Sequence, residues 1–307
     1  MALPPLKSLF LVASLAVAPF TFAQDQTERP LPDVPTLMHE VEQHQRASET
    51  IQKDYIFHEV TNVQANGKER ETREYDVFWL NGVEVHKLTR KDGRDLTEDE
   101  KKKESDRIDK EVAKAKERKS KAASEGKETD SHGHEEVTVS RFLALGSFTS
   151  PRRVQLDGRD TIAIDYTGDP KAKTHNRGEE VIRNLTGTIW IDEEDRSIAR
   201  LEGRFINNFK VGAGLVINIK NNTTFAFEQR KINGEVWLPS HIEGHGAARV
   251  MLFVNFDGTV RFNYSDYRKF KATSTILPGV ATVNEPSNPE GTPPAQSTDG
   301  APALSPR

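Results

Sequence analysis

Short runs of alternating apolar and polar residues, separated by Asn-Gly or Asp-Gly, recur along much of this chain. A type I′ hairpin turn needs a positive φ at both central residues, and these dipeptides adopt it readily. The sequence therefore predicts hairpins at Asn66-Gly67, Asn81-Gly82, Asp157-Gly158, Asn233-Gly234 and Asp257-Gly258. Successive hairpins form an antiparallel sheet, so such a sheet is expected to be the main element of the fold.

The part from 185 to 270 has the most regular pattern of this kind. Apolar-alternating runs and tight polar turns follow one another there, which indicates a meander of strands. The expected strands cover 188–191, 198–206, 215–230, 236–243, 249–256 and 260–264, preceded by 54–63, 68–80, 83–90, 148–155 and 161–166. Within 215–230 the apolar residues alternate, so they are expected on one face of a long strand. They are Leu215, Ile217, Ile219, Phe225 and Phe227.

Three segments outside the strands have the features of helices. Residues 33–45 form the first, because Asp33 can cap its N-terminus and Pro35 suits its first turn. Leu37, Met38, Val41 and His44 fall on one face of it. Residues 137–145 and part of 171–184 are expected to be short helices.

Residues 97–123 differ in composition from the rest, since they are almost wholly charged residues and alanine. Thr97 and Glu100 form a capping box, which predicts that a helix begins there. The apolar stripe of this helix is narrow and consists of Ile108, Val112 and Ala115. We expect a solvated helix that lies on the sheet or projects from it and adds little to stability. The alternative is a contact surface for another protein.

The two ends of the chain are expected to lie outside the folded domain. Residues 1–23 carry Lys7, an apolar run and a final Ala23, which is the pattern of a cleaved secretory signal peptide. The apolar run is too short to span a bilayer core of about 30 Å. Residues 278–307 are rich in Pro, Ser, Thr and Gly and predict a disordered tail. One domain over 32–271 remains, with the charged helix and a flexible link as an insertion over 96–136.

Composition and motifs exclude several classes of function. The chain has no cysteine, so disulfides, thiol catalysis and cysteine-ligated metals are excluded. A net charge of −4 argues against nucleic-acid binding. His132, His134 and Glu135 could hold zinc, but they lie in a polar linker without a rigid element to fix ligand geometry. No nucleophile motif is present, so we expect no catalytic residue, no metal and no cofactor.

A curved sheet with one apolar face, covered loosely by helices, would leave an apolar cavity for a ligand. A close-packed core without a cavity fits the same pattern, and the sequence does not separate the two. If the cavity exists, bulky apolar residues on successive strands are the expected ligand contacts. These candidates are Trp190, Phe205, Leu215, Phe225, Trp237 and Phe253.

Three segments resemble strands of the periplasmic lipoprotein-carrier superfamily, the LolA/LolB-like group of outer-membrane lipoprotein-sorting proteins. They are Leu185-Thr-Gly-Thr-Ile-Trp-Ile-Asp192, Ser197-Ile-Ala-Arg-Leu-Glu202 and Val236-Trp-Leu-Pro239, and the resemblance extends from about Pro32 to Phe270. It implies an α+β fold in which a curved antiparallel sheet, an open and incomplete β-barrel, is covered by a few helices around a lipid-binding interior. The inserted charged helix is a departure from the simplest carriers.

The resemblance and the signal-like N-terminus together predict a periplasmic or secreted protein that is not an enzyme. Its expected partner is an acyl chain or a lipidated protein, and no membrane span is expected after cleavage of the signal. The alternative is an envelope interaction or stress-sensing module of the same fold, which binds a protein partner through the charged helix. Neither reading involves nucleic acid.

Overall fold

The computed structural model describes residues 29–211, 217–221, 223–250 and 254–270. The chain divides into two units, Met1–Leu31 and Pro32–Arg307, and every helix and strand named below belongs to the second. The expected signal peptide (1–23) and tail (278–307) lie outside the described residues, so both remain predictions.

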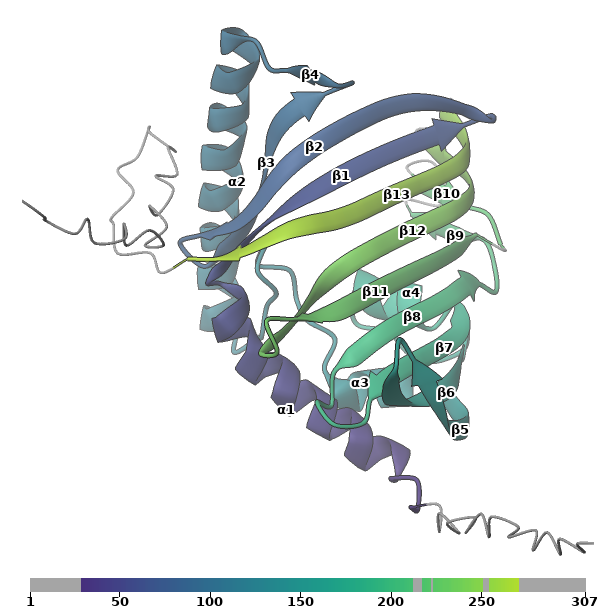
Figure 1. Ribbon diagram of the computed structural model, residues 1–307. Coiled ribbons are helices and arrows are strands. Elements are labelled where there is room, and N and C mark those ends of the chain that lie inside the picture. Colours follow the sequence, from purple (N-terminus) through teal and green to yellow (C-terminus); the bar gives the residue numbers. More distant parts are fainter. Residues whose placement is uncertain (1–28, 212–216, 222, 251–253, 271–307) are drawn as a thin grey trace, which may run out of the picture. The chain divides into compact units, whose positions relative to one another are not determined.

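The described part of the chain contains four helices and thirteen strands (Figure 1). The helices are α1 (Val34–Gln52), α2 (Glu98–Ser124), α3 (Val139–Ala144) and α4 (Arg177–Ile182). The strands are β1 (Tyr55–Ala65), β2 (Lys68–Leu80), β3 (Val83–Lys91), β4 (Arg94–Asp95), β5 (Gly146–Leu156), β6 (Arg159–Gly168), β7 (Leu185–Asp192), β8 (Ile198–Phe205), β9 (Phe209–Val211), β10 (Ile217–Ile219), β11 (Thr224–Ile232), β12 (Val236–Val250) and β13 (Val254–Lys269).

All thirteen strands belong to one antiparallel sheet, in the order β4-β3-β2-β1-β13-β12-β11-β8-β7-β6-β5. The short strands β9 and β10 pair with each other, and β10 also pairs with β12. The edge strands β4 and β5 do not pair with each other among the described residues, so the curved sheet stays open (Figure 1). The expected fold class, an open antiparallel sheet covered by a few helices, is confirmed.

Four of the five predicted Asn-Gly and Asp-Gly turns are hairpin turns in the structure. Both residues of the pairs beginning at Asn66, Asn81, Asp157 and Asn233 have positive φ. The left-handed conformation matches the twist of the flanking strands, which is why these dipeptides mark hairpins so well.

The prediction of a turn at Asp257-Gly258 is wrong, because both residues lie inside β13. Gly258 pairs with Gly246 of β12 on one side and with Ala65 of β1 on the other. A Cβ atom at Gly258 would come within 1.9 Å of the carbonyl oxygen of Gln64. Glycine is therefore needed here for the close approach of β1 and not for a turn.

Two of the expected strands are each divided in the structure. The run 215–230 contains β10 and β11, because the chain turns between them: the amide of Thr223 donates to the carbonyl of Lys220 at 3.3 Å. Ile219 and Phe225 therefore do not share a strand. The run 249–256 contains the end of β12 and the start of β13, and residues 251–253 between them lie outside the described part.

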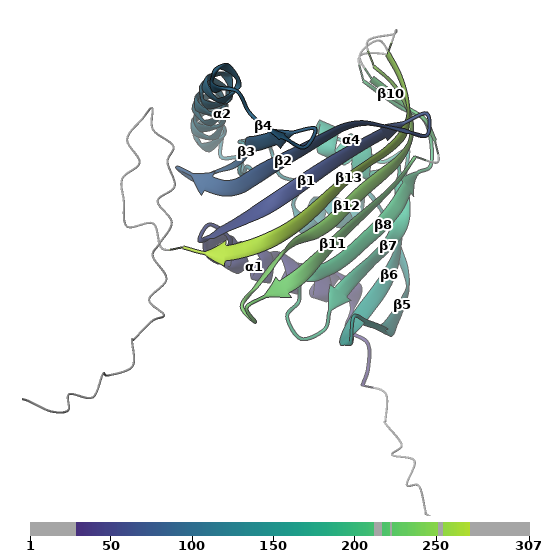
Figure 2. The same cartoon turned by 45° about the horizontal axis from the view of Figure 1, so that its top comes forward.

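Helix α1 begins where the sequence predicts and extends seven residues beyond the expected end at 45. The carboxylate of Asp33 accepts a hydrogen bond from the amide of Thr36 at 3.2 Å, which caps the N-terminus. Its apolar face packs on β6 and β7 and forms the first core cluster with α3. Figures 1 and 2 show α1 lying across the strands near one end of the sheet. The buried members are Leu37, Met38, Val41, Ile162, Ile164, Tyr166, Ile189 and Ile191.

The charged helix α2 lies on the sheet beside β3, so the expectation that it adds little to stability is not supported. Its stripe of Ile108, Val112 and Ala115 is buried against apolar residues of β1 to β3. Two side chains of α2 also bond the backbone of β3. The carboxylate of Glu104 accepts from the amide of Leu88 at 2.8 Å, and Arg107 donates to the carbonyl of His86. Helix α2 thus covers part of a sheet edge that would otherwise be free to pair with another chain.

Candidate ligand-binding site

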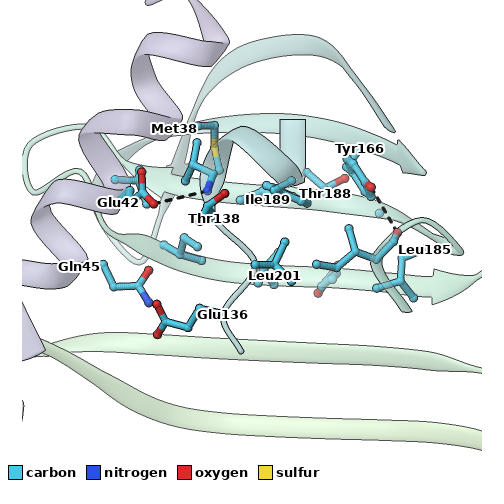
Figure 3. Close-up of a pocket in the computed structure, with 18 of the residues that line it drawn as sticks. Met38, Glu42, Gln45, Glu136, Thr138, Tyr166, Leu185, Thr188, Ile189 and Leu201 are labelled. Carbon is cyan, nitrogen blue, oxygen red and sulfur yellow. Dashed lines mark hydrogen bonds between the residues drawn. The ribbon is translucent and has the colours of Figure 1, made fainter. Parts of the chain in front are cut away.

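A pocket of about 410 Å³ lies between α1, α3 and the face of the sheet formed by β7, β8 and β11 (Figure 3). Its volume is within the range of about 300–1,000 Å³ typical of small-molecule sites. Segments that are distant in sequence form it: the first helix, the 136–142 segment and the strands after 185, with Tyr166 of β6 and Ile182 of α4. The lining residues are Met38, Val41, Glu42, Gln45, Arg46, Glu49, Glu136, Val137, Thr138, Val139, Phe142, Tyr166, Ile182, Leu185, Thr186, Gly187, Thr188, Ile189, Ile198, Leu201, Glu202 and Phe225.

Most of the pocket lining is apolar because each element presents an apolar face to it, although Thr186, Thr188 and Glu202 of the sheet also line it. Helix α1 contributes Met38 and Val41, which lie three residues apart on one helical face. Helix α3 contributes Phe142, whose ring lies 5.0 Å from that of Tyr166 on β6. Leu201 of β8 lies on the opposite wall, as Figure 3 shows. Such a surface is suited to a hydrocarbon ligand.

A buried ion pair holds α3 and α4, which carry part of the wall. Glu179 of α4 is 2% exposed and accepts from Arg141 of α3 through Nε at 2.8 Å and Nη2 at 2.9 Å. The amide of His175 donates to the same carboxylate at 2.7 Å. The hydrogen bonds from Arg141 lower the pKa of Glu179 to about 2, so the carboxylate stays charged at neutral pH. The positions of α3 and α4 are therefore fixed relative to each other.

Two paired glycines form part of the sheet floor. Gly187 of β7 lies opposite Gly203 of β8, with Tyr166 on one side of this pair and Phe225 on the other. A Cβ atom at Gly203 would come within 2.7 Å of the Phe225 ring. Glycine at 203 therefore lets the aromatic ring lie over the neighbouring strand and form one side of the pocket.

Polar groups gather at the rim of the pocket, on α1 and the adjoining linker. Glu42, Gln45, Arg46 and Glu49 come from α1, and Glu136 comes from the linker. The backbone amide of Val139 donates to the carboxylate of Glu42 at 3.5 Å, which joins α1 to the start of α3 (Figure 3). The site thus has an apolar interior and a charged mouth.

The six ligand contacts expected from the sequence are dispersed in the structure. Phe225 lines the pocket. Trp190 lies against Arg200, and Phe205 is buried beside Phe209 with the ring centroids 5.9 Å apart. Trp237 is buried, and its Nε1 donates to Asp195 at 2.9 Å. Leu215 and Phe253 lie outside the described residues.

Sequence reasoning missed the lining residues on the helices, such as Met38 and Phe142. The signal that could have found them was present, since both lie on apolar faces of predicted helices. A helix that covers a one-sided sheet must direct that face toward the sheet. The six candidates Trp190, Phe205, Leu215, Phe225, Trp237 and Phe253 all come from expected strands and so include no helical residue.

No group of three His, Cys, Asp or Glu side chains is placed to hold a metal ion in the part of the chain that the structure describes. At the sequence candidate, the amides of His132 and His134 both donate to Asp130, which forms a tight turn. Arg118 lies 3.2 Å from Nε2 of His134, and this cation would repel a metal ion. Among the described residues, no helix is long and apolar enough to cross a bilayer.

Comparison with known proteins finds solved structures with a similar fold. No protein-family model matches the chain, and no curated protein matches its sequence. The fold is similar to that of a Vibrio parahaemolyticus structure described as an outer membrane lipoprotein-sorting protein domain. That structure is 11% identical, with a TM-score of 0.38 over 76% of this chain and 93% of the other.

Two further structures have comparable likeness. A LolA superfamily protein from Nitrosomonas europaea is 11% identical, with a TM-score of 0.31 over 75% of this chain and 93% of its own. A DUF1329 family protein from Desulfovibrio piger is 10% identical, with a TM-score of 0.36 over 80% of this chain and 96% of its own. These likenesses concern the fold alone.

Proposed function

We propose that this protein is exported and binds an acyl chain, of a lipid or of a lipidated protein, in the pocket beneath α1. The observation that carries the proposal is the distribution of polarity in the pocket. Apolar side chains of α1, α3 and the sheet form most of its lining, and the charged lining groups come from α1 and the linker, with Glu202 of β8 as the one from the sheet. An amphiphile has the same distribution, with a hydrocarbon chain and one polar end.

The expected affinity follows from the area that such a ligand would bury. Each methylene transferred from water contributes about 0.8 kcal/mol. A chain of about twelve carbons would gain about 9 kcal/mol before the costs of ordering, which are several kcal/mol for any association. With about 4 kcal/mol of such costs, about 5 kcal/mol remains, so a dissociation constant on the order of 0.1 mM is expected for this chain, and longer chains should bind more tightly.

We propose no catalytic role for the site. None of its described lining residues is Ser, His, Asp or Lys, so a hydroxyl nucleophile beside an imidazole base cannot be assembled from them. Thr188 lines the pocket, but its hydroxyl already donates to Asp165 at 2.9 Å.

The alternative is that α2 binds a protein partner, and fewer observations in the structure support it. The apolar stripe of α2 is used within the protein, where it packs on β1 to β3. A partner would have to bind the exposed charged face, which includes Lys103 and Lys114. Reversing these two charges should leave acyl binding unchanged if the pocket is the functional site. Loss of a partner in the same variant, with acyl binding kept, would favour the interaction module.

Filling the pocket tests the proposal directly. Leu201 lies on the pocket wall and is only partly buried, so Leu201→Trp should occupy part of the space and keep the fold. Lipid-free Leu201→Trp protein should bind a fluorescent acyl probe with an uncharged head group at least about tenfold more weakly than wild type, since two lost methylene contacts are worth that factor. The control is Leu156→Trp, which makes the same change at the end of β5, outside the pocket. If folded, lipid-free wild type binds no acyl probe at all, the proposal is wrong.

A further inference from the structure

The charged groups at the mouth of the pocket are mostly carboxylates. Glu42, Glu49 and Glu136 line it there, Glu202 of β8 lines the pocket from the sheet and accepts from Arg200, and Arg46 is the one cation among the described lining residues. Arg46 is already paired, because its Nη2 lies 3.3 Å from Glu42 and 2.6 Å from Glu128. Its positive charge is thus neutralised by carboxylates of the protein itself, so Arg46 would attract an anionic head group only weakly.

Glu49 and Glu136 have no ion pair with a cation in the described part of the chain. Lys119, a cation within electrostatic range of Glu49, donates instead to the carbonyl of Gly82 at 2.7 Å. Burial raises the pKa of Glu136 first and the nearby charge of Glu49 raises it next, while the charge of Arg46 acts in the opposite direction. Both carboxylates remain able to interact with the polar end of a bound molecule.

We propose that the mouth of the pocket selects amphiphiles by the charge of the head group, accepting neutral or cationic ones and rejecting anionic ones. The proposal rests on the proposed function, because the hydrocarbon chain must occupy the apolar interior for its head group to lie at the mouth. An anionic head group would then lie within a few ångströms of several carboxylates, where repulsion is only partly screened. A free fatty acid is thus a poor ligand, and an acylated amine or neutral lipid a good one.

Three twelve-carbon ligands that differ in the head group separate these possibilities. Dodecyltrimethylammonium, dodecyl maltoside and dodecanoate share the chain and carry positive, zero and negative charge at pH 8. Titration calorimetry below the micelle concentration, at about 20 mM salt, should give at least about tenfold tighter binding of the cation than of the anion. At about 1 M salt, where the screening length is about 3 Å, this ratio should approach one.

Variants at the mouth test whether Glu49 and Glu136 cause the preference for the cationic ligand. The double variant Glu49→Gln with Glu136→Gln should lower the cation-to-anion ratio at least about threefold and leave dodecyl maltoside binding unchanged. Glu117→Gln, at an exposed position of α2 outside the lining, is the control and should keep the wild-type ratio.

The outcomes distinguish this inference from the proposed function. If dodecyl maltoside binds and dodecanoate binds as well as the cation, charge selection is wrong and the acyl pocket stands. A wild-type ratio in the double variant would likewise overturn the assignment to Glu49 and Glu136. If none of the three ligands binds to folded protein, the proposed function fails, and the inference fails with it.

Discussion

His86 of β3 is held between two carboxylates on the sheet. Its Nδ1 lies 2.9 Å from Glu59 and its Nε2 lies 3.0 Å from Glu84. Carboxylates accept hydrogen bonds, so both ring nitrogens must donate, and the ring is an imidazolium. Glu59 is 3% exposed and also accepts from the hydroxyl of Thr61 at 2.9 Å. A buried carboxylate on β1 is thus neutralised by a cation two strands away.

This pairing predicts how stability depends on pH. Burial alone would lower the pKa of His86, but the hydrogen bonds to Glu59 and Glu84 outweigh it and raise the pKa to about 9. The folded state therefore holds the proton more tightly than the unfolded state, whose histidine pKa is about 6.5. The stabilisation is fully present below about pH 6.5 and is lost as the pH rises through about 9. Because the ring is partly exposed, we expect a loss on the order of 1–2 kcal/mol.

Urea unfolding at pH 6.5 and pH 9.5 measures this loss, and NMR titration of the ring gives the pKa itself. His86→Gln should remove the His86 contribution to the pH dependence. His44→Gln, at an exposed histidine of α1, should retain it. A ring of His86 that titrates below pH 7 would contradict the prediction.

The narrow apolar stripe of α2 attaches this helix to the sheet. Only Glu104, Ile108, Val112 and Ala115 are buried among its 27 residues. This small set includes both the apolar contacts with the sheet and the carboxylate that bonds the edge of β3. A helix that looks wholly solvated by composition is therefore part of the core, because three apolar residues at helical spacing are enough to attach it.

Val112→Asp tests this packing. It places an unpaired charge against β1 to β3, so we expect unfolding to become easier by about 3 kcal/mol or more. The matched control is Ala113→Asp, which adds the same charge one residue later on the exposed face and should change stability by less than about 0.5 kcal/mol. Hydrogen exchange at the amide of Leu88, which donates to Glu104, should become faster only in Val112→Asp. An unchanged urea midpoint for Val112→Asp would show that α2 is dispensable.

Helices and turns with strong local sequence signals could be predicted. The distant parts of the chain that they contact could not. The capping box at Thr97 and the turn at Asn233-Gly234 depend on residues a few positions apart, and both are present in the structure. Asp257-Gly258 has the same local signal, but there the approach of β1 determines the need for glycine. That approach involves residues nearly two hundred positions away, which no local pattern records.

The candidate site likewise depends on contacts between residues that are distant in sequence, so it is a property of the whole molecule. The apolar residues Leu37, Met38 and Val41 of the helix over 33–45 were predicted correctly, but the pocket exists only because α1 and α3 lie over β7, β8 and β11. The six aromatic and aliphatic candidates share a large side chain and a position in an expected strand, and neither property distinguishes a core residue from a cavity residue. Packing inside the protein accounts for Trp237, whose ring is buried and whose nitrogen bonds Asp195. Only the three-dimensional arrangement separates residues that fill the core from those that face a cavity.

At this largest scale we predict that the protein leaves the cytoplasm as a shortened chain and carries a lipid when it is isolated. Residues 1–23 have a basic residue, an apolar run and small residues at the expected cleavage point, so the mature chain should begin at Gln24. If the proposed export is correct, the apolar pocket of about 410 Å³ should be occupied by a lipid, since each buried methylene favours occupancy by about 0.8 kcal/mol.

Native mass spectrometry of protein purified from its own cell envelope tests both parts at once. The expected spectrum contains the mass of a chain from Gln24 together with an adduct in the mass range of an acyl lipid. Leu201→Trp should give the same chain mass with much less adduct, because the substitution fills the pocket without affecting export. Ala23→Arg should block cleavage and yield the longer chain, since a small residue is needed at that position. Intact Met1 in a cytoplasmic fraction would end the export proposal. A mature wild-type chain that carries no adduct and takes up no acyl probe would contradict lipid binding. A protein partner would then be the remaining alternative.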